Sequence, residues 1–264
     1  MCRGCLVTFS IYAILFSGFL MPQSLPVDRP ATAAHPILVE LFTSEGCSSC
    51  PPADALVEKL DDTQPVPGAQ LIVLSEHVDY WDHDGWKDPN SSPAMTERQE
   101  AYVHALGLDS PYTPQIVVDG TSLLRVGDPH QIATLLRTAA LTSKDPVRIE
   151  EVSIGTPGSA VMQARIVADG NSDSRNADIY VAIAKDRVES QVLHGENGGR
   201  RLTHIAVVQQ LTKIGSLPAG KSFDQTVRLK LKSGIDPNNV RIVAFVQEPG
   251  PGKLLGAALW KPKT

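Results

Sequence analysis

The 264-residue sequence is poor in aromatic side chains, in cysteine and in excess positive charge. Phe, Trp and Tyr together make up 5% of the chain, which argues against a carbohydrate-binding surface. The formal net charge is −5 and no clustered basic stripe is present, so a nucleic-acid partner is not expected. The sequence also lacks a glycine loop of the Rossmann or Walker type, which argues against a nucleotide cofactor.

The first 34 residues are not expected to belong to the fold. Residues 6–20 form an apolar run of about the length of a signal-peptide core, which is short for a membrane span. The small residues at 31–33 then offer a cleavage site. We therefore predict an exported protein, periplasmic or secreted, in which residues 1–34 are a signal peptide. Because the gap before the cleavage site is long, an uncleaved membrane anchor at 6–20 is the alternative.

Export would leave a single pair of thiols. The chain has four cysteines in two CxxC pairs, and Cys2 and Cys5 would be removed with the signal peptide. Cys47 and Cys50 would then be the only cysteines of the mature chain. In an oxidising compartment these two should be bonded to each other unless a partner reduces them.

The pair Cys47–Cys50 stands between an apolar run at 37–42 and a helical pattern at 53–60. Two cysteines with this spacing at a strand-to-helix junction are typical of a redox pair. One thiolate attacks a foreign disulfide, and the other resolves the mixed disulfide that results. Metal knuckles and structural disulfides use the same spacing, so both remain alternatives.

Secondary-structure patterns change near Ser143. Before it, strands and helices alternate in the order β-α-β-α-β-β-α, whereas after it nearly all the patterns predict strands. The first part has predicted strands at 37–42, 71–74, 115–118 and 122–126 and predicted helices at 53–60, 93–106 and 128–142. The second part has predicted strands at 147–154, 160–168, 178–184, 187–193, 223–231, 240–247 and 256–260, while 203–211 fits either a helix or a strand. Short strands at this spacing are typical of an antiparallel sandwich.

A second motif, Thr113-Pro114, directly precedes the predicted strand at 115–118. The element order, the CxxC after the first strand and this Thr-Pro together resemble the thioredoxin fold. The resemblance implies that the Thr113–Pro114 bond is cis, lies against the cysteines and positions the substrate chain. A cis X-Pro bond costs only about 0.5–1 kcal/mol relative to trans, so a fold can retain it. The alternative is an ordinary trans proline in a loop.

A more particular pattern occupies five segments, at 40–54, 77–82, 96–99, 112–115 and 195–200. Together they resemble domain-of-unknown-function family 1223, which consists of secreted thioredoxin-like proteins. The expected organisation is an α/β thioredoxin-like domain at 35–143, with a loop and helix inserted at 76–112, followed by an all-β, sandwich-like domain at 144–264. The resemblance implies the fold and the export, and it supplies no substrate.

By analogy with thioredoxins, Cys47 would be the nucleophile and Cys50 the resolving thiol. Pro51 and Pro52 have no N–H groups, so we expect the helix to begin near Pro51 and to leave Cys47 just outside it. Nearby carboxylates outnumber cations, and negative charge disfavours a thiolate. We therefore predict a moderately reactive pair rather than a strong oxidant.

Polar residues around the pair are candidates for a substrate groove or a proton carrier. They are Glu40, Glu45, His77, Asp79 and Trp81. For Glu40, the alternative is a solvent-facing or capping role. For the candidates at 76–86, the alternative is a packed loop without a role in the site. His77, Asp79, His83 and Asp84 are also residue types that bind metals, although no metal site is predicted. The glycine-rich segment at 194–201 is predicted as a β-turn with charged flanks, and a contact of Arg200 or Arg201 with the first domain is the alternative. His204 has no predicted role.

The sequence thus predicts thiol–disulfide exchange on a protein or small-thiol substrate, without a cofactor and with electrons from a partner thiol–disulfide protein. No membrane partner is expected beyond the leader or anchor. The first alternative is a binding module on a thioredoxin scaffold with a structural disulfide. The second is soft-metal handling, in which both thiols would hold an ion such as Cu(I).

Overall fold

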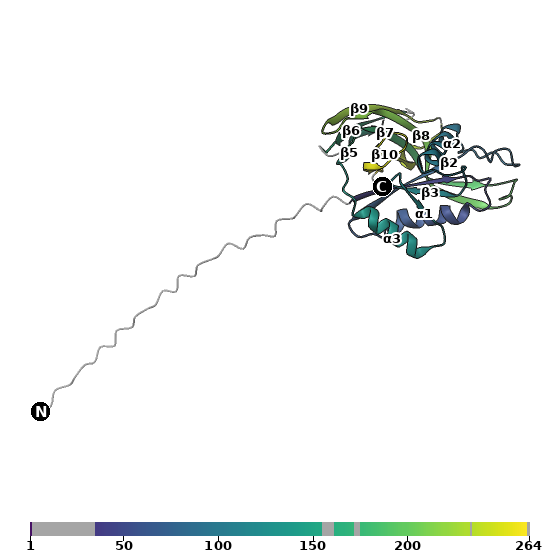
Figure 1. Ribbon diagram of the computed structural model, residues 1–264, viewed down its shortest axis with the longest axis horizontal. Coiled ribbons are helices and arrows are strands. Elements are labelled where there is room, and N and C mark those ends of the chain that lie inside the picture. Colours follow the sequence, from purple (N-terminus) through teal and green to yellow (C-terminus); the bar gives the residue numbers. More distant parts are fainter. Residues whose placement is uncertain (2–34, 155–160, 172–174, 233, 263–264) are drawn as a thin grey trace. The chain divides into compact units, whose positions relative to one another are not determined.

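The computed structural model describes residues 1, 35–154, 161–171, 175–232 and 234–262 (Figure 1). The predicted leader or anchor at 1–34, with Cys2 and Cys5, lies outside the described residues except for Met1. Within the described part, no helix has the length and apolar character needed to cross a membrane. Residues 33–264 make up one compact unit.

The predicted order β-α-β-α-β-β-α is confirmed for the first half of this unit. Its elements are β1 (His35–Thr43), α1 (Pro51–Thr63), β2 (Ala69–His77), α2 (Pro93–Ala105), β3 (Gln115–Val118), β4 (Ser122–Leu124) and α3 (Pro129–Ala140). Each helix has proline in its first turn, where the missing N–H group costs no hydrogen bond. Asp128 caps α3 as predicted, because its carboxylate accepts a hydrogen bond from the backbone N–H of Gln131 at 2.9 Å.

The second half consists almost entirely of strands, also as predicted. They are β5 (Val147–Ile154), β6 (Val161–Asp169), β7 (Ala177–Gln191), β8 (Arg201–Leu217), β9 (Ser222–Lys230), β10 (Val240–Gln247) and β11 (Leu254–Trp260), with a short 3-10 turn η1 (Pro237–Asn239) before β10. Two predicted strands at 178–184 and 187–193 are one continuous strand, β7. The ambiguous segment 203–211 lies in β8, which pairs antiparallel with β7 along nearly its whole length.

One eight-stranded sheet runs through both halves in the order β11-β10-β7-β8-β2-β1-β3-β4. In it, β1 pairs parallel with β2 and antiparallel with β3. The two halves join where Ser75 of β2 pairs with Val207 of β8. This sheet continues across the predicted domain boundary at 143/144. The physical reason is that β2 would otherwise be an open edge strand, with backbone N–H and C=O groups left unpaired.

Both faces of β1 are buried, and the second half supplies one of the covers. Side chains alternate between the faces of a strand. Ile37, Val39 and Leu41 pack against α1 and α3. Leu38, on the other face, packs in a cluster with Phe245 of β10. The two halves therefore share a core, which explains why they form one unit.

A smaller sheet in the order β5-β6-β9 forms a second antiparallel layer. Its residues Met162, Ile166 and Phe223 share a buried cluster with Ile179 and Ile242 of the large sheet. The strands of the second half therefore pack as two layers, one of which is part of the eight-stranded sheet that also contains β1 to β4.

Candidate functional site

Cys47 and Cys50 form a disulfide in the turn between β1 and α1, with their Cα atoms 5.4 Å apart. The helix α1 begins at Pro51 with Cys50 as its N-cap, as predicted. Pro51 and Pro52 offer no N–H group, and the N–H of Ala53 donates to the carbonyl of Cys50 at 2.8 Å. Pro51, Pro52 and Ala53 therefore have no free backbone N–H group that could donate a hydrogen bond to the Cys47 sulfur. The Ser49 hydroxyl does lie 3.3 Å from the Cys47 sulfur.

Both cysteines are fully buried, with 0% of each residue exposed. A loop at 194–199 between β7 and β8, here called the cover loop, provides part of the covering. The side-chain amide of Asn197 donates to the carbonyl of Glu45 at 2.9 Å and to that of Cys47 at 3.0 Å. The Glu196 carboxylate accepts a hydrogen bond from the N–H of Ser48 at 3.0 Å. The cover loop thus closes over the CxxC turn.

Glu196 and Asn197 make the contact with the first half that was the alternative prediction for Arg200 or Arg201. Arg200 donates to the Asn197 side-chain oxygen at 2.9 Å and therefore orients the amide. Arg201 pairs with Glu189 on β7 instead. Asparagine can both donate and accept, which lets it bridge between Arg200 and the CxxC turn.

The segment Thr113-Pro114 adjoins the cysteine turn, and its peptide bond is cis. The Ser49 hydroxyl donates to the carbonyl of Thr113 at 3.5 Å. The indole N–H of Trp81 donates to the Thr113 hydroxyl at 2.8 Å. Trp81 also packs on Gly46, where an added Cβ would lie 3.1 Å from the Trp81 Cβ. Trp81 therefore ties the Thr-Pro segment to the cysteine turn.

Glu45 and His77 are joined beneath this turn by Asp88. The Glu45 N–H donates to Asp88 Oδ2 at 2.9 Å, and His77 Nδ1 lies 2.7 Å from the same oxygen. Burial lowers the pKa of His77, but the charge of Asp88 and the hydrogen bond to it raise that pKa more, so it stands above its usual value. Burial raises the pKa of Asp88, but His77 and backbone N–H groups lower it to about 2.

His204 and Asp54 were not predicted as site residues, and the structure places them in the same region. The His204 ring lies edge-on to that of His77, with 4.7 Å between centroids. Its Nδ1 is 3.2 Å from Asp54 Oδ1, and Asp54 also accepts a hydrogen bond from the Thr43 hydroxyl at 3.2 Å. The position of Asp54, one helical turn after Cys50, is a sequence signal that could have identified it. No local pattern marks His204.

Glu40 and Asp79 lie apart from this group. Glu40 is fully buried, but its carboxylate accepts hydrogen bonds from Arg98 at 2.8 Å and from the hydroxyl of Tyr102. On β1 it alternates with Leu41, whose side chain packs toward α1. Asp79 accepts a hydrogen bond from Thr96 at 2.6 Å and so anchors the first turn of α2. Glu40 is therefore buried and does not face solvent. The contacts with Arg98 and Thr96 direct the carboxylates of Glu40 and Asp79 at α2 rather than at the CxxC turn.

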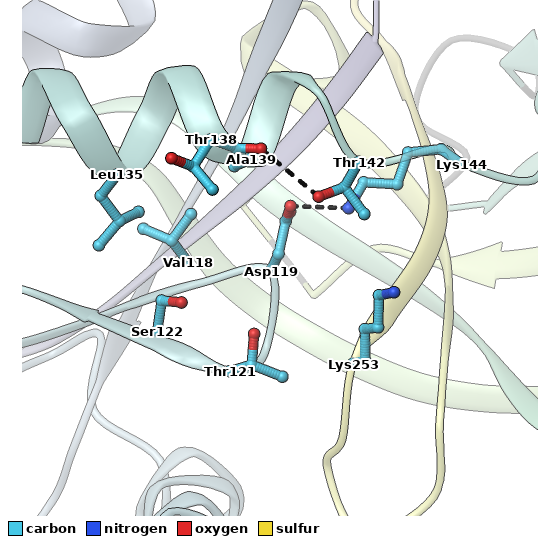
Figure 2. Close-up of a pocket in the computed structure, with 10 residues that line it drawn as sticks. All are labelled: Val118, Asp119, Thr121, Ser122, Leu135, Thr138, Ala139, Thr142, Lys144 and Lys253. Carbon is cyan, nitrogen blue, oxygen red and sulfur yellow. Dashed lines mark hydrogen bonds and ion pairs between the residues drawn. The ribbon is translucent and has the colours of Figure 1, made fainter.

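A cavity of about 330 Å³ lies elsewhere, between α3 and the β3–β4 turn (Figure 2). Asp119 in its wall accepts hydrogen bonds from Lys144 Nζ at 2.7 Å and from the N–H of Leu38 at 3.0 Å. Leu38 stands in the first half of β1, whereas the cysteines follow the end of that strand. The lining contains neither cysteine nor histidine, so we place the candidate site at the disulfide. Among the described residues, no group of three or more His, Cys, Asp or Glu could hold a metal ion.

Comparison with known proteins gives a family and a fold. The family described as "Protein of unknown function (DUF1223)" matches residues 38–247. A crystal structure of a protein from Agrobacterium tumefaciens is similar, with 26% sequence identity, a TM-score of 0.68 and coverage of 88% of this chain and 96% of that one. The sporulation control protein Spo0M of Bacillus subtilis matches at 13% identity over 44% of this chain and 46% of its own, with a TM-score of 0.32. This TM-score is too low to indicate a shared fold. No curated protein matches the chain.

Proposed function

The chain belongs to the DUF1223 family, and from this premise we propose that it is an exported thioredoxin-like protein that exchanges disulfides through Cys47 and Cys50. The observation that carries the proposal is the convergence of the CxxC turn with the Thr113-Pro114 segment. The Ser49 hydroxyl donates to the Thr113 carbonyl, which joins the two across the end of β1. The order β2-β1-β3-β4, with α1 and α3 packed on one face, supports a thioredoxin-like first half.

The proposed reaction needs no cofactor. The Cys47 thiolate attacks a substrate disulfide, so that a bond forms between Cys47 and one substrate sulfur and the other sulfur leaves as a thiolate that takes up a proton. Cys50 then attacks Cys47, which re-forms the internal disulfide and releases the second substrate thiol. The substrate disulfide is reduced, and a partner dithiol protein reduces Cys47–Cys50 for the next cycle.

Access to the pair requires that the cover loop move. Both cysteines are fully buried, so neither a substrate nor a reducing partner reaches a sulfur while the loop is closed. Among the described residues, the hydrogen bonds between the loop and the CxxC turn are those made by Glu196 and Asn197. Its glycines at 195 and 199 have positive φ angles of 74° and 83°, a conformation that other residues rarely adopt.

A specific observation also favours the second candidate, a binding module with a structural disulfide. Complete burial protects a disulfide from exchange, since attack requires access to the sulfur. In that case the disulfide would hold the CxxC turn in shape for binding. Soft-metal handling remains a prediction from the CxxC spacing.

Redox titration distinguishes exchange from a structural disulfide. The purified protein is equilibrated with glutathione buffers, and its free thiols are counted by alkylation and mass spectrometry. Exchange predicts a midpoint above about −300 mV, whereas a structural disulfide resists reduction below that potential. A Cys50→Ser variant should also trap mixed disulfides in the exported fraction, and Cys47→Ser, which lacks the attacking thiol, is its control. Failure to trap any partner, together with a midpoint below −300 mV, would favour the structural role.

A further inference from the structure

Four titratable side chains form a buried row next to the CxxC turn, in the order Asp88, His77, His204 and Asp54. Their exposed fractions are 2%, 0%, 2% and 5%. The contacts along the row are 2.7 Å between Asp88 and His77, 4.7 Å between the histidine ring centroids and 3.2 Å between His204 and Asp54. Burying such groups is costly unless they are paired, so this arrangement calls for an explanation.

One end of the row belongs to the first turns of α1, four residues after the resolving cysteine. Asp54 follows Cys50 by four residues on α1, and its N–H donates to the Cys50 carbonyl at 3.2 Å. Side chains four apart share a helix face, with Cβ atoms about 5–6 Å apart. Helical side chains also point back toward the N-terminus, which directs Asp54 toward Cys50. The helical register therefore places the Asp54 carboxylate on the same face of α1 as Cys50.

Each element that packs around the Asp54–His204 pair contributes an identified group. The end of β1 presents the Thr43 hydroxyl, which donates to Asp54. His77, at the end of β2, faces His204, and Asp88 and Glu45 lie behind His77. Among the described residues, the ion pairs within the row are those of His77 with Asp88 and of His204 with Asp54, and neither involves Lys or Arg.

The histidines have unused hydrogen-bonding capacity. In the part of the chain that the structure describes, Nε2 of His77 and both ring nitrogens of His204 have no hydrogen-bond partner, so the 3.2 Å contact between His204 Nδ1 and Asp54 is a close approach and not a formed hydrogen bond. Buried polar atoms without a partner are rare in native proteins, and a catalytic role is one recognised reason for them. Nitrogens that are not held by a hydrogen bond can gain or lose a proton without breaking one.

We propose that Asp54 and His204 take up the proton that the Cys50 thiol releases when it resolves the mixed disulfide. This inference rests on the proposed exchange function. In the step, the Cys50 sulfur forms a bond with Cys47, the bond from Cys47 to the substrate sulfur breaks, and its electron pair leaves on the substrate thiolate. The proton passes from Cys50 to the Asp54–His204 pair and from there to the departing thiolate. His77 and Asp88 are positioning residues, which hold the His204 ring.

The need for such a base follows from burial. A thiol has a pKa of about 8.5 in water, and apolar burial raises it, so a buried Cys50 would be almost entirely protonated at pH 7. Only the thiolate attacks a disulfide. A positioned base contributes about 10²- to 10⁴-fold to a proton transfer of this kind.

The test is the pH dependence of mixed-disulfide resolution. The full-length protein is reduced and mixed with glutathione disulfide, and the Cys47–glutathione adduct is followed by acid quench and mass spectrometry from pH 5.5 to 9. In Asp54→Asn and His204→Gln, we expect adduct resolution at pH 7 to slow by about 100-fold. We also expect their rates to rise about tenfold per pH unit, as for an unassisted thiol, while the wild-type profile is flatter.

Asp61→Asn is the matched control. Asp61 is a buried carboxylate on the same helix, but it pairs with Arg241, so its loss should affect stability and leave the shape of the pH–rate profile unchanged. If Asp54→Asn does not fold, His204→Gln, which retains both carboxylates, decides the question. Wild-type profiles for both variants would overturn the proton-transfer inference while exchange itself stands. If the wild-type protein forms no adduct and resists glutathione, the proposed function and this inference both fail.

Discussion

The side-chain amide of Asn197 donates a hydrogen bond to the backbone carbonyl of Cys47 at 3.0 Å, although 150 residues separate the two in sequence. The same amide donates to the carbonyl of Glu45 at 2.9 Å. Both bonds are buried, so water cannot replace them while the cover loop is closed. The side chain of one asparagine in the second half of the chain thus takes part in covering the disulfide of the first half.

Asn197→Ala should therefore expose the disulfide. Loss of both hydrogen bonds leaves two carbonyls unsatisfied in the closed state, which costs about 1–3 kcal/mol and favours opening of the cover loop. We expect dithiothreitol to reduce the pair about tenfold faster than in the wild-type protein, measured by alkylation quench and mass spectrometry. Asn239→Ala is the control, because Asn239 similarly donates to the carbonyl of Arg187 at 2.9 Å but lies away from the cysteines. Equal reduction rates for all three proteins would contradict the covering role.

Ser49 should lower the pKa of Cys47 in the reduced protein. Its hydroxyl donates to the Thr113 carbonyl in the disulfide form, but it lies 3.3 Å from the Cys47 sulfur and can turn its one proton to the thiolate when the pair is reduced, which stabilises the charged form. With little help from the helix N-terminus, we expect a Cys47 pKa above about 5, rising in Ser49→Ala. The rate of iodoacetamide alkylation against pH measures it, with Cys50→Ser as the background. Ser48→Ala, which removes the adjacent hydroxyl, should leave this pKa unchanged, and a wild-type value below 5 would contradict the prediction.

The His77–Asp88 pair should make stability depend on pH in two ranges. The pKa of His77 is raised, so its contribution is complete below its unfolded value of about 6.5 and is lost as pH rises through the folded value. The pKa of Asp88 is lowered to about 2, so its contribution is present above its unfolded value and is lost as pH falls toward 2. The Asp88 shift corresponds to about 2 kcal/mol.

Urea unfolding between pH 5.5 and 8.5 tests the upper range. We expect the free energy of unfolding to fall with rising pH in the wild-type protein, and this slope to be smaller in His77→Gln. His130→Gln is the control, because His130 is exposed at the start of α3. A His77→Gln slope as steep as that of the wild-type protein would show that this pair does not carry the dependence.

Arg241 should contribute strongly to the stability of the joined halves. It is 1% exposed on β10 and donates to Asp61 of α1 at 2.9 and 3.0 Å and to Asp186 at 2.7 Å. Arg241→Met leaves a buried carboxylate without its main partner, which typically costs about 3–5 kcal/mol. Arg165→Met is the control, since Arg165 pairs with Asp224 on the surface and should cost less than about 1 kcal/mol. Urea denaturation measures both, and comparable losses would contradict the prediction.

Much of the first half could be predicted because its signals are local. The apolar run at 37–42 and the prolines at 51, 93 and 129 mark the strand and the helix starts in the residues themselves. The second half was predicted as strands for the same reason. The pairing of β2 with β8 in one sheet could not be predicted, since alternation shows which residues share a face of a strand and does not show which strand lies beside it.

The candidate site was predictable in part. Spacing alone pointed to Cys47 and Cys50, and the resemblance to thioredoxins pointed to Thr113-Pro114. Glu40 was a reasonable candidate by position, but strand alternation turns it toward Arg98 on the other face. His204 could not be recognised, because its neighbours in the site come from α1 and β2 rather than from its own strand.

The position of the disulfide, the start of α1 and the order of the elements could be predicted, because they depend on residue spacing, on the missing N–H of proline and on short-range periodicity. The covering of the disulfide and the row of acids and histidines next to the CxxC turn arise from long-range contacts. Those features depend on β8 pairing with the edge of β2 and on the cover loop returning to Cys47. Such contacts join segments far apart in the chain, and burial rather than local propensity determines which of them form.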